Sequence, residues 1–348
     1  MKWSATKLFF LFFLIISTLI SISSNSWFSA WMGLEINLLS FIPLMINSKN
    51  QLSSESSLKY FLIQAFASSL LLYFILFFYL NMNFFLFNEF MSSYKSIFIS
   101  IPLMIKIGMA PFHYWFPSVM DGISWINAFY LMTWQKIAPM ILMMNSIYLN
   151  NLSFYLYFFI LISIVMGTLG GLNQTSLRKI MAFSSINHLA WMLLAMIFND
   201  ILWLTYFLLY SFLILSIVFF FNMFNLSYIN QMYLMFSDNN SMKIYFMINF
   251  LSLGGLPPFL GFAPKFLIIE TLMSLNYYFI LTIFIIMNLI TLYFYLRISL
   301  GAFLIKNTNN IMEYQYKYNP FIIFLTAFLT FISFNGLMIV YLFIFIFI

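Results

Sequence analysis

Cysteine is absent from this chain of 348 residues, and charged residues make up only 6% of it. Without cysteine the chain forms no disulfide and offers no thiolate for an iron–sulfur cluster or a zinc site. Its two histidines, His113 and His188, argue against a haem or a histidine-rich metal site. The shortage of charge excludes an ordinary soluble domain, in which about a quarter of the residues are charged.

Apolar residues take the place of the missing charge and make up 64% of the chain. In a bilayer every backbone polar group must be paired within the protein, so only helices and closed barrels can span it. Barrel strands alternate apolar and polar residues. Runs such as Leu8–Ile22 do not alternate, so the sequence predicts an all-α integral membrane protein.

Eleven apolar segments are long enough to cross a bilayer at about 20 residues each. They lie near 5–23, 27–46, 58–80, 95–112, 124–147, 153–172, 177–197, 201–224, 243–275, 277–299 and 320–346.

The basic residues support this number of spans. With eleven spans, ten of the 14 Lys and Arg residues fall in loops on the side of the N-terminus. Lys95 alone falls on the other side, and Lys106, Lys136 and Lys265 fall inside spans. Basic loops are retained on one side of a membrane. The net charge of +6 therefore describes topology and does not indicate nucleic-acid binding.

The fourth and ninth spans share the residues that break helices. The fourth contains Pro102, Gly108 and Pro111, and the ninth contains Gly254-Gly255-Leu256-Pro257-Pro258. Because these spans are five apart, they cross in opposite directions, as in inverted repeats. We predict one transmembrane domain over 1–348, composed of repeat one at about 1–150, repeat two at about 151–305 and a final helix at about 320–346.

Five titratable residues lie near the middle of their spans: Glu35, Lys106, Lys136, His188 and Lys265. A charge at the bilayer centre costs at least about 2.5–3.5 kcal/mol, and five at similar depth cannot all reach the headgroups. We expect them to face one another or water inside the bundle. Desolvation disfavours a charged lysine and a neighbouring carboxylate favours it, so such groups suit a proton relay.

Each of these residues also has a simpler interpretation. Glu35 suits a structural ion pair, the lysines suit snorkelling toward the headgroups, and His188 suits packing. Two further residues are weaker candidates. His113 follows the fourth span beside Tyr114 and Trp115 and suits an interfacial position. Glu270 is a candidate for the ion-pair partner of Lys265 or for the outlet of the proton relay.

Five stretches of the chain resemble the antiporter-like membrane subunits of respiratory complex I, in the form found in insect mitochondria. These subunits are related to parts of multicomponent sodium/proton antiporters. The resemblance covers essentially the whole chain and is carried by residues 25–43 (NSWFSAWMGLEINLLSFIP), 106–117 (KIGMAPFHYWFP), 133–139 (TWQKIAP), 170–191 (GGLNQTSLRKIMAFSSINHLAW) and 249–265 (NFLSLGGLPPFLGFAPK).

The resemblance implies a membrane-arm subunit that contributes to proton translocation, coupled to quinone reduction in other subunits. Glu35, Lys106, Lys136, His188 and Lys265 match the family's proton-route positions. The resemblance implies no cofactor in this chain, with FMN, iron–sulfur clusters and ubiquinone held elsewhere. The implied partners are neighbouring antiporter-like and small membrane subunits, accessory subunits and lipids such as cardiolipin, with no nucleic acid.

The implied location is the mitochondrial inner membrane, with the N-terminus in the matrix and the C-terminus in the intermembrane space. Two rival functions remain open from the residues. One is a stand-alone cation/proton antiporter, and the other is a scaffold whose buried charges only fix helix packing.

Overall fold

The computed structural model describes residues 5–47, 50–80, 85–148, 153–235, 240–304 and 324–336. All regular elements in these ranges are helices, and an isolated bridge joins Ser176 and Tyr228. The predicted all-α fold is therefore confirmed. The chain divides into two compact units, Met1–Ser163 and Ile164–Ile348.

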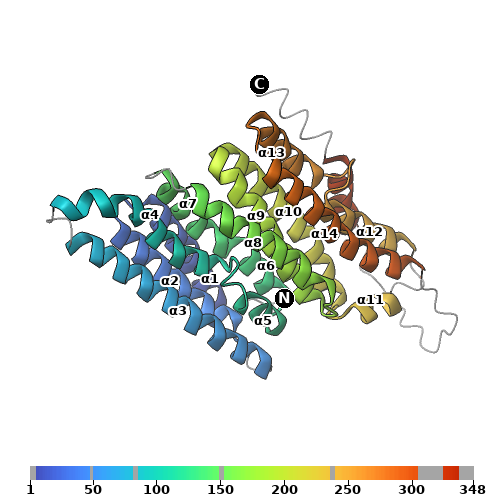
Figure 1. The fold of residues 1–348 in the computed structure, drawn as a ribbon. Coiled ribbons are helices and arrows are strands. Elements are labelled where there is room, and N and C mark those ends of the chain that lie inside the picture. Colours follow the sequence, from blue (N-terminus) through green and yellow to red (C-terminus); the bar gives the residue numbers. More distant parts are fainter. Residues whose placement is uncertain are drawn as a thin grey trace. The chain divides into compact units, whose positions relative to one another are not determined.

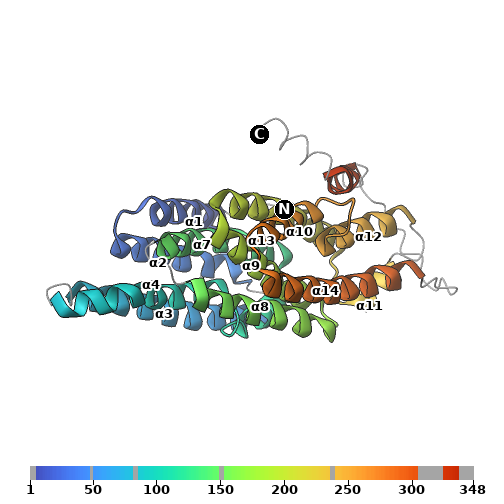
Figure 2. The same cartoon turned by 45° about the horizontal axis from the view of Figure 1, so that its top comes forward.

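The first unit contains seven labelled helices and the start of an eighth. In it α1 packs beside α2, and the long α3 and α4 lie side by side (Figures 1 and 2). The helices are α1 (Ala5–Ser23), α2 (Trp27–Met45), α3 (Gln51–Leu80), α4 (Phe85–Ile107), α5 (Trp115–Gly122), α6 (Trp125–Met132), α7 (Trp134–Tyr148) and the first half of α8 (Ser153–Leu172).

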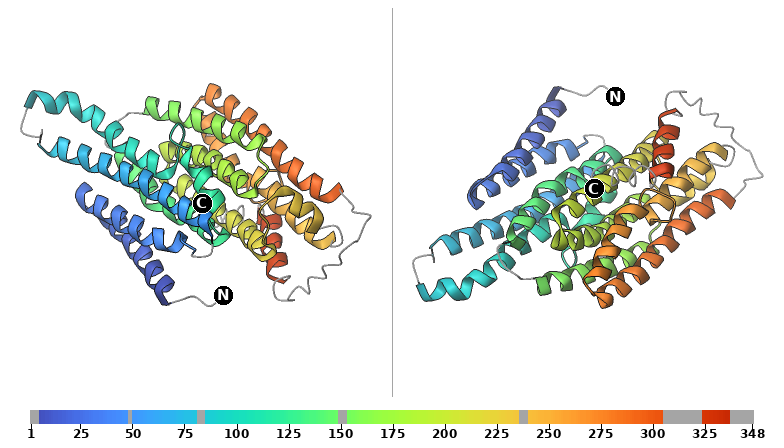
Figure 3. Two further views of the ribbon diagram at one scale, coloured as in Figure 1. Left: turned by 90° about the horizontal axis from the view of Figure 1, so that it is seen from below. Right: turned by 90° about the horizontal axis from the view of Figure 1, so that it is seen from above.

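The second unit begins within α8. In it α12 and α14 pack side by side, and α9 packs on α10 and α13 (Figure 3). Its further labelled helices are α9 (Leu177–Phe198), α10 (Asp200–Phe224), α11 (Ile229–Met235), α12 (Asn240–Gly254), α13 (Phe262–Ser274) and α14 (Tyr278–Leu304). A further apolar helix covers Phe324–Gly336.

Seven helices of the described residues are long and apolar enough to cross a membrane. They are α1, α2, α3, α9 and α10 together with Tyr155–Leu172 and Tyr278–Gly301. The other predicted spans are interrupted, shortened or described only in part, so the number eleven stays a prediction. The predicted final helix at 320–346 is helical over Phe324–Gly336, and the rest of it lies outside the described residues.

Three predicted boundaries are wrong. The predicted span 124–147 is two helices, because the backbone departs from regular helix at Thr133, where φ is −117° and ψ −73°. Helix α3 begins at Gln51 and not at 58, and α4 covers Phe85–Ile107 and not 95–112. Polar residues in the first turns of α3, and the polar stretch from Asn88 to Lys95 that follows the apolar start of α4, hide these helix starts from a hydropathy pattern.

Capping residues fix several helix ends. Ser26 precedes α2, and its hydroxyl accepts a hydrogen bond from the backbone N–H of Ser29 at 3.2 Å. Asn199 does the same for Ile201 at the start of α10, at 3.0 Å. Asn225 ends α10 in the left-handed conformation, with φ of 52°. The Ser26 and Asn199 side chains satisfy unpaired N–H groups at helix starts, and the backbone N–H of Asn225 donates to the Phe221 carbonyl at the end of α10.

Serine hydroxyls inside the apolar helices are satisfied within their own helix. Ser17 donates to the Leu14 carbonyl at 2.9 Å and Ser163 donates to the Ile160 carbonyl at 2.8 Å. Each hydroxyl thus has a partner one turn back along the helix. Such residues add polarity to a span without requiring water or a second helix.

Candidate functional site

The first broken helix ends at a glycine in the left-handed conformation. Gly108 has φ of 80°, which side chains with a Cβ rarely adopt. Its N–H donates to the Ile105 carbonyl at 3.2 Å, and the Met109 N–H donates to the Met104 carbonyl at 3.1 Å. This is the Schellman arrangement that closes a helix end. Pro111 follows and prevents the helix from resuming at once.

The second broken helix repeats this local structure. Gly255 has φ of 77° and follows the last residue of α12. Its N–H donates to the Ser252 carbonyl at 3.0 Å, and the Leu256 N–H donates to the Leu251 carbonyl at 3.3 Å. Pro258 stands three residues after the glycine, as Pro111 does in the first break. The predicted break in the fourth and ninth spans is therefore present, with the same terminating device.

Lys106 is the next-to-last residue of α4 and is 7% exposed. Its position places it at the negative end of a helix dipole, which favours a cation. The Gln64 amide donates to the Lys106 backbone carbonyl at 3.1 Å. That bond occupies a carbonyl which the helix end leaves without an intrahelical partner.

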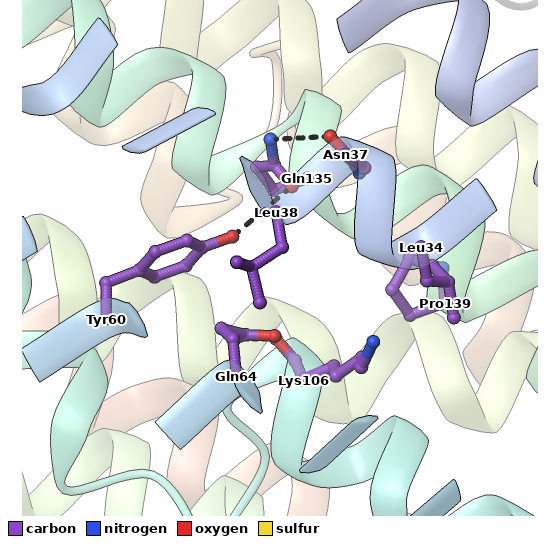
Figure 4. Close-up of a pocket in the computed structure, with 8 residues that line it drawn as sticks. All are labelled: Leu34, Asn37, Leu38, Tyr60, Gln64, Lys106, Gln135 and Pro139. Carbon is purple, nitrogen blue, oxygen red and sulfur yellow. Dashed lines mark hydrogen bonds between the residues drawn. The ribbon is translucent and has the colours of Figure 1, made fainter. Parts of the chain in front are cut away.

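A small polar cavity lies beside Lys106. Its volume is about 10 Å³, which is room for about one water molecule. Figure 4 shows the Lys106 side chain extending toward Leu34 and Pro139, with the polar groups of the other residues around the same space. The lining residues are Leu34, Asn37, Leu38, Tyr60, Gln64, Lys106, Gln135 and Pro139.

A chain of hydrogen bonds crosses this cavity between three helices (Figure 4). The Gln135 amide of α7 donates to Asn37 Oδ1 of α2 at 3.1 Å. The Tyr60 hydroxyl of α3 donates to Gln135 Oε1 at 3.4 Å. The three side chains hold α2, α3 and α7 together around Lys106.

Glu35 lies on α2 next to the cavity residue Leu34 and is half-buried. Its carboxylate interacts electrostatically with Lys106. In the part of the chain that the structure describes, the two side chains form no direct ion pair. Glu35 is thus close enough to act on Lys106 electrostatically without forming an ion pair with it.

Lys136 lies in the first turn of α7 and is 1% exposed. Its Nζ lies 5.2 Å from the centre of the Phe116 ring, a distance at which a cation and a ring attract. Its backbone N–H donates to the Thr133 carbonyl at the break between α6 and α7. Glu35, Lys106 and Lys136 therefore lie on three helices of the first unit that pack together, since α7 packs on both α2 and α4.

Lys265 lies in the first turn of α13 and is 2% exposed. Its Nζ donates to the Gly254 carbonyl at 3.0 Å and to Asn288 Oδ1 at 2.6 Å. It also lies 5.9 Å from the centre of the Trp191 ring. Gly254 is the last residue of α12, so the ammonium group reaches back across the break to the carboxyl end of that helix.

His188 lies in the middle of α9, one turn before Trp191, and is 4% exposed. Its Nδ1 is 2.9 Å from the Tyr206 hydroxyl, and its ring centre is 5.0 Å from that of Tyr210. His188 and Trp191, whose ring lies near Lys265, are thus one turn apart on α9. His188 has a polar partner that can exchange a hydrogen bond with it.

The structure places the two weaker candidates as follows. His113 is 3% exposed and packs on Tyr114 at 4.4 Å between ring centres, and its position at the membrane interface stays a prediction. Glu270 is exposed and does not pair with Lys265, whose partners are Gly254 and Asn288. Five positions along a helix point side chains away from each other, which is the physical reason.

The polar residues around the lysines are not predicted from the sequence. They are uncharged, and the cost of a charge at mid-membrane singles out titratable groups alone. A signal for them exists, because an amide or hydroxyl in an apolar span needs a partner. The residues concerned are Asn37, Tyr60, Gln64, Gln135, Tyr206 and Asn288.

Similarity to known proteins defines the class. The family model for the transmembrane part of NADH:quinone oxidoreductase and Mrp antiporter subunits matches residues 24–291. A chain of respiratory complex I from Thermus thermophilus has a TM-score of 0.82 at 20% identity, covering 97% of this chain and 79% of that one. A chain of the Mrp complex from Dietzia sp. has a TM-score of 0.72 at 16% identity, covering 86% and 61%. The fold is that of an antiporter-like membrane subunit.

Curated relatives narrow the class to one subunit. NADH-ubiquinone oxidoreductase chain 2 of Anopheles gambiae is 53% identical over 95% of this chain and 96% of its own. The same chain of Aedes aegypti is 52% identical over 98% of both, and that of Mus musculus is 37% identical over 90% and 92%. The chain belongs to the NADH-ubiquinone oxidoreductase chain 2 family, whose members are proton-translocating membrane subunits of a multi-subunit respiratory complex.

Proposed function

We propose that protons cross the membrane arm through this chain along Glu35, Lys106, Lys136, His188 and Lys265. Quinone reduction in other subunits changes the electrostatic environment of Glu35. Lys106 then gains or loses a proton, and the relay continues at Lys136, His188 and Lys265. The observation that carries the proposal is the burial of three lysines, two of which lie beside polar groups at the broken ends of helices.

The chemistry of these groups suits transfer better than storage. A buried ammonium group is stable only while its partners compensate for lost hydration, so a small change in a partner shifts its protonation. Lysine can lose its proton, which arginine does not do in proteins. The one-water cavity beside Lys106 supplies a carrier between a lysine and the Tyr60–Gln135–Asn37 chain.

We also propose that redox chemistry takes place elsewhere in the complex. The chain has no cysteine for an iron–sulfur cluster, which supports placing the clusters in other subunits; FMN and ubiquinone are proposed to lie there with them. Glu270 and His113 are proposed as secondary positions on the route, Glu270 as an outlet on the exposed face of α13.

The proposed location is the mitochondrial inner membrane, with the N-terminus in the matrix. The uneven distribution of lysine and arginine between loops supports this orientation. Neighbouring antiporter-like, small and accessory subunits, and lipids such as cardiolipin, are the proposed partners. The apolar faces of α1 and α3 suit such contacts, since Phe12 is 61% exposed and Leu62 65%.

The test is proton stoichiometry in the assembled complex reconstituted into vesicles. The variants are Lys136→Ala and Lys136→Met, which keeps the length of the side chain, with the exposed Lys59→Met as control. We expect fewer protons per NADH in both Lys136 variants and the wild-type ratio in the control. An unchanged ratio in assembled Lys136 variants removes Lys136 from the route and favours a scaffold role. Proton transport by the isolated chain favours a stand-alone antiporter.

A further inference from the structure

Two connections and the end of α14 meet at one end of the second unit. The loop between α8 and α9 pairs with the segment that follows α10. The Ile229 N–H donates to the Thr175 carbonyl at 3.2 Å, and the Leu177 N–H donates to the Ser227 carbonyl at 3.0 Å. Helix α11 then packs on the last turns of α14. These bonds hold the two connections in a defined shape at the end of α14.

A pocket lies among these connections. Its volume is about 690 Å³, within the range of roughly 300–1,000 Å³ typical of ligand sites. All but one of its lining residues have a polar side chain. They are Asn173, Gln174, Thr175, Tyr228, Ile229, Asn230, Tyr233 and Arg297.

Arg297 is the charged residue of this pocket. It is exposed, and in the described residues no carboxylate forms an ion pair with it. Burial raises the pKa of Tyr233, and the Arg297 guanidinium partly offsets that rise, so the two side chains share one electrostatic environment. A guanidinium beside hydroxyl and amide donors is the group that binds phosphate with several hydrogen bonds.

An apolar stripe continues from Arg297 along the same face of α14. Tyr293, Leu289 and Ile286 follow at spacings of three and four residues and are 59%, 61% and 55% exposed. At about 1.5 Å per residue, the stripe from Arg297 to Ile286 is roughly 17 Å long. That is close to one leaflet, since the hydrocarbon core of a bilayer is about 30 Å thick.

We propose that this pocket binds the phosphate headgroup of an anionic phospholipid whose acyl chains lie along the exposed face of α14. The polar pocket and the stripe form two parts of one site, with the charge at the end where a headgroup belongs. The inference deepens the lipid partnership proposed above and does not depend on the proton route.

Two alternative roles of Arg297 fit the structure less well. An arginine that only snorkels to the membrane surface needs no pocket of hydroxyl and amide groups beside it. An acidic segment of another subunit would use the pocket but would leave the apolar stripe without a role. A phospholipid uses both parts.

The experiment compares lipid retention by the assembled complex carrying Arg297→Leu or Tyr233→Phe with that of Lys59→Leu. Lys59 is likewise an exposed basic residue of the proposed matrix side, but it lies on α3, in the first unit. Each complex is delipidated and incubated with vesicles of phosphatidylcholine, with or without phosphatidylglycerol. Bound phospholipid per complex is then measured by mass spectrometry, and protons per NADH are measured on the same samples.

We expect Arg297→Leu to weaken retention of phosphatidylglycerol at least about fivefold, as loss of roughly 1 kcal/mol per basic residue implies. Tyr233→Phe should weaken it less, and Lys59→Leu should not change it. Equal retention of phosphatidylglycerol by the Arg297→Leu and Lys59→Leu complexes overturns the proposal. Binding of phosphatidylcholine as strongly as phosphatidylglycerol by the unaltered complex also overturns it. Displacement of the lipid by inorganic phosphate alone assigns the pocket to free phosphate and overturns the lipid assignment. Failure of the proposed proton route would be recognised by a different result, which is an unchanged number of protons per NADH in the Lys136 variants.

Discussion

The two broken helices end in the same way but hold their lysines differently. Each first half ends in a left-handed glycine with the same pair of backbone hydrogen bonds. Lys106 belongs to the first half of its broken helix, whereas Lys265 belongs to the second half and reaches back to the Gly254 carbonyl. Lys106 is therefore itself part of the carboxyl-terminal turn of α4, whereas Lys265 reaches the carboxyl end of α12 with its ammonium group.

Their partners also differ in charge. Lys106 interacts with the Glu35 carboxylate, whereas Lys265 donates to the neutral amide of Asn288. A carboxylate can change its own charge, and an amide cannot. We infer that the first break is suited to receive an electrostatic signal from another helix, and that the second break is suited to hold a proton with fixed dipoles.

Removing the carboxylate should have the largest effect. Glu35→Gln makes the partner of Lys106 a neutral amide, like that of Lys265. We expect proton translocation per NADH to fall about five- to a hundredfold, the range of coupling free energies of roughly 1–3 kcal/mol. Proton uptake by reconstituted complex measures it. Glu55→Gln, which neutralises an exposed carboxylate on α3, is the control, and equal ratios in the two variants would contradict a signalling role of Glu35.

The reverse exchange should have the next largest effect. Asn288→Asp gives Lys265 a carboxylate in place of the amide oxygen 2.6 Å away and makes the second break resemble the first. We expect a stable ion pair and about fivefold slower proton translocation, because the proton must leave a compensated charge. The matched control is Asn276→Asp, at an exposed amide in the turn before α14. Wild-type translocation in the Asn288→Asp complex would show that a neutral partner is not required.

The glycines separate stability from proton transfer. A Cβ at Gly255 would lie 3.0 Å from Lys265 Cδ and 3.1 Å from its Nζ, whereas one at Gly108 would lie 3.2 Å from the Phe116 and Trp115 rings. Both alanine variants should lose about 1–2 kcal/mol, the cost of the left-handed conformation. Gly255→Ala should also reduce protons per NADH, because it displaces Lys265. Thermal inactivation measures the loss of stability, and proton stoichiometry in vesicles measures the loss of proton transfer. Equal numbers of protons per NADH in the Gly255→Ala and Gly108→Ala complexes would contradict the expected difference.

The smallest effect should come from the amide that caps the first break. Gln64→Leu removes the donor to the Lys106 carbonyl, and we expect a loss of about 1 kcal/mol. Thermal inactivation of the complex measures the loss, with the exposed Gln51→Leu as control. The same midpoint temperature of inactivation in both variants would mean that water replaces the Gln64 amide as the donor to the Lys106 carbonyl.

The sequence predicts the breaks and the buried lysines well, because Gly108, Gly255 and the following prolines have direct backbone consequences. Of the two roles that it suggests for Glu270, partner of Lys265 or outlet, the first is wrong. Glu270 is near in sequence, but the true acceptor, Asn288, lies on α14, 23 residues away. Distance along the chain does not report which helices pack together.

The break at Thr133 is missed for a related reason. No glycine or proline stands at that position, and the Thr133 hydroxyl donates to the Phe129 carbonyl at 2.7 Å as in an ordinary helix. Packing around α6 and α7 therefore sets the irregular backbone. The candidate proton route itself remains a proposal, which the variants above test.

The serine hydroxyls that donate within their own helices have a consequence for hydration. Each such hydroxyl has already used its hydrogen, so it is a poor donor to any water that enters the bundle. The Asn37 and Gln135 side-chain amides each have two N–H hydrogens and keep a donor beyond the bonds described above, so water should gather at these two residues and avoid the serine-rich faces. Counting polar residues alone would place the water in the wrong helices.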